Sequence, residues 1–381
     1  MSRIKVIRTL LLMASLATTV AHAAETIRIA NLVELSGAGA TSGTNFRNGV
    51  EMAVKEINAA GGILGRQIQT TTSDTQSNPG VAKGLAQKAI DDDVFAVFGP
   101  VFSGSIMVSM AETRRAEIIN FTGGEASNIT KQGNPYIFRT SFTQDSAMPK
   151  VARYISGTLK AKSVALIYVN NDYGKGGREA FFKSLLPFGI NVLADISTDQ
   201  NQVDFSSPVL KVKQSNADVV FVYTNEEESA RVLRELRKQG VNKPIVGETT
   251  LVGQKVIELA GEAANGVVAH VGLTVDAPIP AMRVFKTRFE NDYHSISDHN
   301  GIKGYTGIYI LKAAIEKVGR LDRKAVAQAL HGLHISAQKN PGVIMDVSID
   351  ANGDLDRESF LVEARNGNQI VKATLPALGS K

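Results

Sequence analysis

Cysteine is absent from the 381-residue chain. This absence excludes disulfide bonds, and it excludes a lipid anchor on a cysteine that would follow a leader sequence. Packing must therefore supply the stability of the fold. Dense clusters of Lys and Arg with interleaved aromatic residues are also missing, which argues against nucleic acid as a partner.

The first residues predict a secretory signal peptide, residues 1–23. Three basic residues within the first eight precede an apolar run at 9–20, and Ala21-His22-Ala23 forms an A-x-A cleavage site. The run is shorter than the roughly 20 apolar residues that a membrane span requires, and no stop-transfer pattern follows it. We therefore expect a soluble periplasmic protein, cleaved near Ala23, whose formal net charge falls from +5 to +2 when the three basic residues are removed.

From Thr26 onward, short apolar runs alternate with helical patterns, which predicts βαβ units around parallel sheets. A first series of strands is expected at 27–33, 67–73, 94–98 and 118–121. A second series is expected at 164–169, 190–196, 219–223, 245–246 and 267–271. Long helices then follow at 280–293, 301–318 and 322–330. The pattern predicts an α/β fold of two similar lobes, and the lack of a disordered linker predicts tight crossings between them.

The segment 94–105 predicts a strand that ends at Gly99-Pro100 and a helix that begins directly after it. Backbone N–H groups at a helix N-terminus are unpaired and carry partial positive charge. With the hydroxyls of Ser103 and Ser105 beside them, they can hold a carboxylate. The alternative is an ordinary turn in which Ser103 or Ser105 caps the helix. These residues alone leave both interpretations open.

A glycine-rich segment at 37–43 is similar at first sight to a dinucleotide-binding loop. Its spacing is G-x-G-x-x-x-G, one residue too long for the Rossmann fingerprint. We therefore expect no nucleotide cofactor. We interpret the segment, which includes Ser42, as a rim loop whose backbone can approach a ligand.

Other motifs argue against a metal site and against catalysis. His331 and His334 have a chelating spacing, but no cysteine or carboxylate triad accompanies them, so surface or capping roles are favoured. No G-x-S-x-G motif is present, and Ser103 has no base that the sequence identifies. Glu226-Glu227-Glu228 opens a helix and predicts a solvated first turn. Tyr173 follows a strand, where it could cover a ligand or the adjacent helix.

Several segments together resemble the periplasmic branched-chain amino-acid-binding family. They are Asn48 to Arg66 (NGVEMAVKEINAAGGILGR), 73–82, 99–105, 171–174 and 258–262, and the resemblance covers essentially the whole mature chain. It implies a type I periplasmic binding protein, with two doubly wound parallel-sheet lobes, three hinge crossings and a cleft that closes over a solute. The implied N-terminal lobe is 24–143 plus 274–342, and the C-terminal lobe is 144–273 plus 343–381. We expect a monomer that is not an enzyme and that delivers its ligand to the permease and ATPase subunits of an ABC importer.

The resemblance also implies which residues line the cleft. The carboxylate-binding serine falls at Ser103, and the remaining positions fall at Phe102, Thr122, Gly123, Glu125, Tyr173, Asn225 and Glu248. Glu248 would pair with a ligand ammonium group.

Two positions depart from the family pattern. Glu125 stands where amino-acid binders commonly present a hydroxyl, and Asn225 stands where they often have an aromatic residue. Glu125 could instead be an acidic first-turn residue of a following helix. If Glu125 lines the cleft, its ligand needs a cationic or hydrogen-bond-donating group, because an unpaired buried carboxylate is costly. We expect an amino acid. The alternatives are the same fold binding an aromatic carboxylate, an amide or urea, or acting as a ligand sensor.

Overall fold

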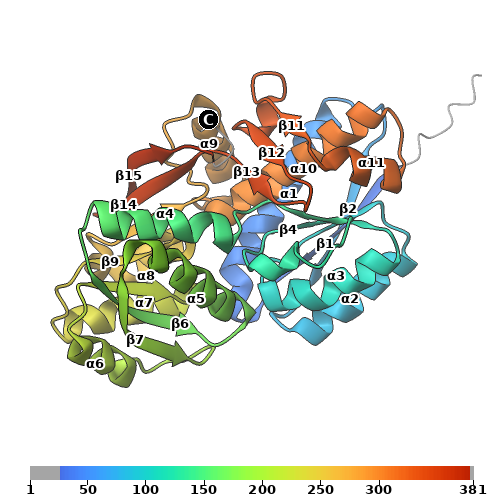
Figure 1. Ribbon diagram of the computed structural model, residues 1–381. Helices are drawn as coiled ribbons and strands as arrows, with labels where there is room; N and C mark the ends of the chain where they lie inside the picture. Colours follow the sequence, from blue (N-terminus) through green and yellow to red (C-terminus); the bar gives the residue numbers. More distant parts are fainter. Residues whose placement is uncertain (1–25, 378–381) are drawn as a thin grey trace, which may run out of the picture.

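One parallel sheet and one mostly parallel sheet, each covered by helices, form the two lobes of the computed structural model, which describes residues 26–377 (Figure 1). The predicted signal peptide lies outside the described residues. Of the helices within 26–377, none is long and apolar enough to cross a membrane. The predicted α/β architecture of two doubly wound lobes is confirmed.

The first lobe contains a five-stranded sheet in the order β2-β1-β3-β4-β5, with every neighbouring pair parallel. Its strands are β1 (Ile27–Val33), β2 (Ile68–Asp74), β3 (Ala96–Phe98), β4 (Ile119–Thr122) and β5 (Ile137–Arg139). Its helices are α1 (Ala40–Ala59), α2 (Pro79–Asp91) and α3 (Ser103–Arg115). The chain leaves β1 for β2 on one side and returns to β3 on the other. The carboxyl ends of β1 and β3 thus flank the point at which the strand order reverses, where ligands bind in open α/β sheets.

The second lobe contains a seven-stranded sheet in the order β15-β14-β10-β9-β8-β6-β7. Its parallel strands are β6 (Ser163–Val169), β7 (Asn191–Thr198), β8 (Val219–Tyr223), β9 (Ile245–Glu248) and β10 (Val268–Val271). An antiparallel pair, β14 (Ser359–Arg365) and β15 (Asn368–Leu375), extends one edge. Its helices are α4 (Gln144–Gly157), α5 (Asp172–Leu185), α6 (Ser206–Ser215), α7 (Glu226–Lys238) and α8 (Gln254–Ala260). Every residue of β8 is buried, as expected for a strand covered on both faces.

Three later helices and a small antiparallel sheet complete the fold. The helices are α9 (Pro280–Tyr293), α10 (His299–Val318) and α11 (Arg323–Leu330), and the small sheet contains β11 (His334–Ile335), β12 (Val347–Ile349) and β13 (Leu355–Asp356). Short 3-10 helices lie at Gly37–Gly39, Ser127–Ile129, Leu186–Phe188, Thr249–Val252, Gly261–Ala264 and Pro341–Val343.

Helix α10 packs against α1 at backbone distance. A Cβ atom on Gly49 would lie 1.9 Å from the carbonyl oxygen of Gly301, and one on Gly304 would lie 2.2 Å from that of Phe46. Only glycine allows this approach. The N-terminal turn of α10 is therefore held against the first lobe.

The chain connects the lobes after β5, after β10 and after β13. Arg139 at the end of β5 donates from Nε to Asp354 Oδ1 at 2.7 Å, and its N–H bonds to the Gly353 carbonyl at 2.9 Å, so the turn between β12 and β13 is tied to the first lobe. Buried Arg357 donates from Nη2 to the Thr140 carbonyl at 3.3 Å, which links the first connection to the third. The expected lobe limits stay a prediction, and these contacts favour a third crossing near Arg357.

Candidate ligand-binding cleft

A cavity of about 220 Å³ lies between the lobes. The first lobe contributes the start of α3, the loop 123–125 and the start of α10, whereas the second lobe contributes the starts of α5 and α7 and Thr250. The volume is below the roughly 300–1,000 Å³ of sites for drug-sized ligands. The cavity therefore suits a small metabolite.

Most of the predicted site residues line this cavity, namely Ser42, Phe102, Ser103, Gly123, Glu125, Tyr173 and Asn225. The other two lie behind its wall. Thr122 donates from Oγ1 to the Pro100 carbonyl at 3.0 Å and so supports the loop that carries Gly123. Glu248 is buried at the end of β9, where it contacts the polar residues described below.

The N-terminus of α3 faces the cavity as predicted from segment 94–105. Phe102 occupies the N-cap position and provides no side-chain cap, so the alternative in which Ser103 or Ser105 caps the helix is wrong. Fully buried Glu34 accepts the N–H groups of Val101 and Phe102, each at 3.1 Å, and burial raises the pKa of this carboxyl to about 7. A side chain of the protein thus holds these two donors. The N–H groups of 103–105 have no partner within the helix.

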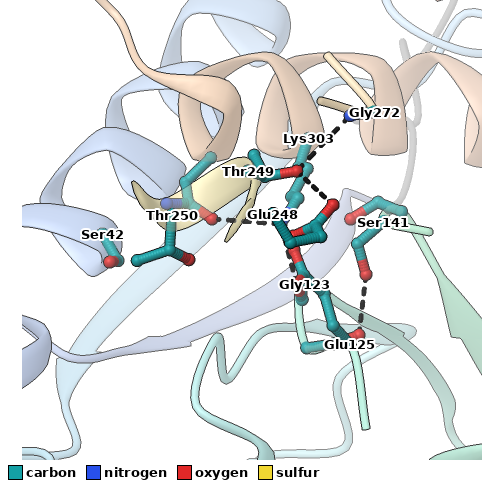
Figure 2. A network of polar contacts seen from close by, with 12 residues as sticks. Ser42, Gly123, Glu125, Ser141, Glu248, Thr249, Thr250, Gly272 and Lys303 are labelled. Carbon is teal, nitrogen blue, oxygen red and sulfur yellow. Dashed lines mark hydrogen bonds and ion pairs between the residues drawn. The ribbon is translucent and has the colours of Figure 1, made fainter. Parts of the chain in front are cut away.

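Lys303, near the start of α10, is the main cavity-lining residue that sequence reasoning missed. It is 4% exposed and donates from Nζ to the Gly123 carbonyl at 3.2 Å, to Glu125 Oε1 at 3.1 Å and to Asn300 Oδ1 at 3.4 Å (Figure 2). An ammonium group has three hydrogens, so these acceptors use all of them. Lys303 therefore positions Glu125. The sequence signal that could have identified Lys303 is its position within the apolar helical pattern of 301–318, where a lysine is unexpected.

Glu125 and Glu248 form a close carboxyl pair from opposite lobes. Burial and the nearby Glu248 raise the pKa of Glu125 to about 7, against the opposing effect of Lys303. Burial also raises the pKa of Glu248. Glu125 is only 8% exposed and precedes the nearest 3-10 helix, so it is not a solvated first-turn residue. Two buried carboxyls this close resist ionising together, and Lys303 offsets only part of this effect for Glu125.

Second-lobe residues orient Glu248. Thr249 donates from Oγ1 to Glu248 Oε1 at 2.6 Å (Figure 2), and His270 Nδ1 lies 3.1 Å from the same oxygen. Burial lowers the pKa of His270 to about 3, so the imidazole is neutral and donates when its proton is on Nδ1. Among the described residues, no side chain with a fixed proton donates to Glu248 Oε2, although a protonated Glu125 can do so.

The start of α7 differs from the solvated first turn that the sequence predicted. Glu227 is exposed, but Glu228 is buried, and its Oε2 accepts the Asn225 N–H at 3.1 Å in a capping box. Glu226 is 7% exposed and accepts a short hydrogen bond from Ser42 across the cleft. The prediction is wrong for Glu226 because it faces the cleft, and it is wrong for Glu228 because this carboxyl accepts the backbone N–H groups of Asn201 and Asn225.

Tyr173 both lines the cavity and covers a neighbouring ring. Its ring stacks on Tyr223 with centroids 4.2 Å apart, and its hydroxyl donates to Thr250 Oγ1 at 3.2 Å. Burial raises the pKa of Tyr173 well above its usual range, so the phenol keeps its proton. The ring therefore covers a residue of strand β8, not the adjacent helix, and its contact with a ligand stays a prediction.

The two histidines with chelating spacing lie outside the cleft. His331 Nε2 is 3.0 Å from the Pro135 carbonyl, and His334 Nδ1 is 2.9 Å from Ser348 Oγ. Within residues 26–377, no group of three or more His, Cys, Asp or Glu side chains is arranged to hold a metal ion.

Comparison with known families identifies the class of protein. The family described as "Periplasmic binding protein" matches residues 26–369, so the chain belongs to this family, and its fold is the type I periplasmic binding protein fold. The "Leu/Ile/Val-binding protein BraC3" of Rhizobium johnstonii is 29% identical, and the match covers 95% of this chain and 97% of that protein.

Two solved structures share the fold. One is the branched-chain amino acid transporter substrate-binding protein LivJ of Streptococcus pneumoniae in complex with isoleucine, with a TM-score of 0.83, 25% identity and coverage of 93% of this chain and 99% of that one. The other is a solute-binding protein of an ABC transporter from Rhodopseudomonas palustris in complex with 3,4-dihydroxybenzoic acid, with a TM-score of 0.84, 21% identity and coverage of 92% and 98%. The second likeness shows the fold alone.

Proposed function

We propose that this protein is the solute receptor of an ABC importer and that it captures an amino acid in the interlobe cleft. The observation that carries the proposal is the opposite character of the two cleft walls. The first lobe presents the N-terminus of α3 with Ser103, which suits a carboxylate. On the second lobe, buried Glu248 lies behind the cavity wall and can supply carboxylate oxygens for an ammonium group, next to Glu125 of the first lobe.

Similarity to the Leu/Ile/Val-binding protein supports an amino acid over other solutes. An aromatic monocarboxylate would bring a further negative charge to a cleft that already contains Glu125 and Glu226, and it would bring no cation to offset them. Phe102 and Tyr173 supply apolar surface for either ligand. The charge balance therefore favours the zwitterion.

The proposed cycle begins with the ligand carboxylate at Ser103 and the first-turn N–H groups of α3. The second lobe then closes and brings Tyr173, Asn225 and Glu248 toward the ligand. Binding shifts the population toward the closed state only as far as the ligand prefers that state. The closed receptor, exported to the periplasm and monomeric, then delivers its ligand unchanged to the permease and ATPase subunits.

A thermal-shift screen of the ligand-free mature protein tests this function. The panel contains the twenty amino acids, small amides, urea and aromatic acids. A ligand at a hundred times its dissociation constant adds about 2.7 kcal/mol to the free energy of unfolding. An aromatic acid that shifts the melt while every amino acid fails would refute the amino-acid assignment. Chemical conversion of a bound solute would refute the receptor role.

A further inference from the structure

Glu226 is a buried carboxylate that the proposed amino-acid headgroup does not use. It lines the cavity, is 7% exposed and accepts a hydrogen bond from Ser42 of the opposite lobe. Among residues 26–377, no basic side chain forms an ion pair with it, and the hydrogens of nearby Lys303 already bond to other acceptors. A carboxylate has about four acceptor positions, so the Ser42 hydroxyl and the N–H group of Glu226 itself leave some of them unfilled.

Burial raises the pKa of Glu226, so its charged form is costly unless a ligand supplies a hydrogen-bond donor or a cation. Asp298, Glu125 and Glu228 are nearby acidic groups, Lys303 is a nearby base, and Ser42 is a neutral partner. His299, which also lines the cavity, is buried and uncharged because burial lowers its pKa well below the usual range. The negative groups at this end of the cavity therefore outnumber the positive ones.

Glu226 also lies apart from the headgroup site. Its partner Ser42 lies to the left of Thr250 in Figure 2, whereas Glu125 and Glu248 lie to the right of Thr250 in the same view. A ligand whose ammonium lies at the Glu125–Glu248 pair must therefore reach Glu226 with another part of the molecule. An aliphatic side chain placed there would bury a carboxylate without supplying a donor.

We infer that the ligand's side chain ends in a nitrogen that donates hydrogen bonds to Glu226, either a neutral amide or a cationic amine or guanidinium. This inference rests on the proposed function and narrows its substrate class. It distinguishes this receptor from one for purely aliphatic amino acids, because leucine, isoleucine and valine carry no side-chain donor.

Isothermal titration with isosteric pairs tests the inference on the mature protein. Ornithine and norleucine differ at the terminal group, where an ammonium replaces a methyl. Glutamine and glutamate differ by an amide against a carboxylate. We expect ornithine or glutamine to bind at least about tenfold more tightly than norleucine, as for a hydrogen bond to a charged group. Tighter binding of ornithine than of glutamine would indicate a cationic ligand, and the reverse would indicate a neutral one.

Variants at neighbouring positions of α7 distinguish a contact between Glu226 and the ligand side chain from a contact that only holds the two lobes together. Glu226→Leu is expected to reduce the ratio between ornithine or glutamine and norleucine at least about tenfold. Glu227→Leu is the matched control because Glu227 is exposed, and it should leave the ratio unchanged. Glu226→Gln, which keeps side-chain size and polarity, should weaken ornithine more than glutamine and provides the same readout if Glu226→Leu does not fold.

The outcomes are distinct. Tighter binding of norleucine or leucine than of the donor-bearing ligands would overturn the inference and leave the amino-acid receptor intact. An equal loss for ornithine and norleucine in the Glu226 variants would also overturn it, since Glu226 would then act only as a clasp with Ser42. Failure of every amino acid to bind would refute the proposed function together with the inference.

Discussion

The two walls of the cleft present opposite hydrogen-bonding groups, donors on the first lobe and an acceptor on the second. On the first-lobe wall, Glu34 and Thr122 bond to the chain around α3, so the donors at its N-terminus are fixed before a ligand arrives. On the second-lobe wall, Thr249 and His270 hold Glu248 in place as an acceptor. A donor wall that faces an acceptor wall orients a zwitterion. Glu125 and Lys303 are the exception, because they add an acidic group and its counterion to the donor wall.

Among the tests of this difference between the walls, removal of the Lys303 ammonium group should have the largest effect. Lys303→Met leaves Glu125 buried without its ion pair and should lower the free energy of unfolding by about 3 kcal/mol. The double variant Lys303→Met/Glu125→Gln should recover most of the loss. Urea denaturation measures both. Equal stability of the single and double variants would show that the pair is not coupled.

Loss of the acceptor on the second lobe should mainly affect binding. Glu248→Gln removes a buried negative charge next to Glu125 and should weaken amino-acid affinity by about 2 kcal/mol, or roughly 30-fold. Titration calorimetry measures the change, with exposed Glu227→Gln as the control. An unchanged affinity would remove Glu248 from the site.

A smaller effect is expected on the donor wall. Ser103→Ala should weaken binding by about 1 kcal/mol, or roughly fivefold, because the first-turn N–H groups remain. Ser109→Ala is a suitable control, since Ser109 lies on the same helix and donates to the Ile106 carbonyl at 3.3 Å. We expect Ser109→Ala to leave the affinity unchanged, even if it changes the free energy of unfolding. If Ser103→Ala weakened affinity as much as Glu248→Gln, the donor wall would contribute as much to binding as the acceptor wall.

The dependence of stability on pH sharpens the same contrast. The pKa of Glu125 rises from 4.5 to about 7 in the folded protein, so the folded state binds more protons than the unfolded state within that interval. The free energy of unfolding of the ligand-free protein should therefore fall as pH rises from about 4.5 to about 7. Glu34 and Asp298, whose pKa values also rise to about 7, contribute in the same direction.

Glu125→Gln provides the check on this assignment. Urea denaturation at several pH values should give a shallower decline for the variant than for the natural chain. Parallel curves for the two proteins would mean that Glu125 does not titrate in this interval.

Local patterns were enough to predict two lobes and nine of the parallel strands, but they missed β5. The strand expected at 94–98 overlaps β3, Ala96–Phe98, and the helix after it presents Ser103 to the cavity. Alternation of apolar runs and helical patterns depends on near neighbours, which the sequence shows directly. The predicted ligand contacts themselves stay predictions until binding is measured.

The contacts of Lys303 and Glu226 were not predictable in this way. Glu226 contacts Ser42, which is 184 positions away in the chain, and Lys303 contacts Glu125 at a separation of 178. Helix periodicity assigns a face to each residue but does not say which distant element covers it. A first-turn glutamate looks the same whether its helix begins in solvent or in a cleft.

The close contact between α1 and α10 has a mechanical consequence. Because Gly49 and Gly304 let the two backbones touch, Lys303 travels with the first lobe and keeps its bond to Glu125 throughout the proposed cycle. Glu248 travels with the second lobe. Closure of an empty cleft therefore brings a further carboxyl group against a pair that is already neutral, whereas an amino acid arrives with its own positive charge. In this proposed cycle the receptor is biased against presenting an empty closed form to its transporter.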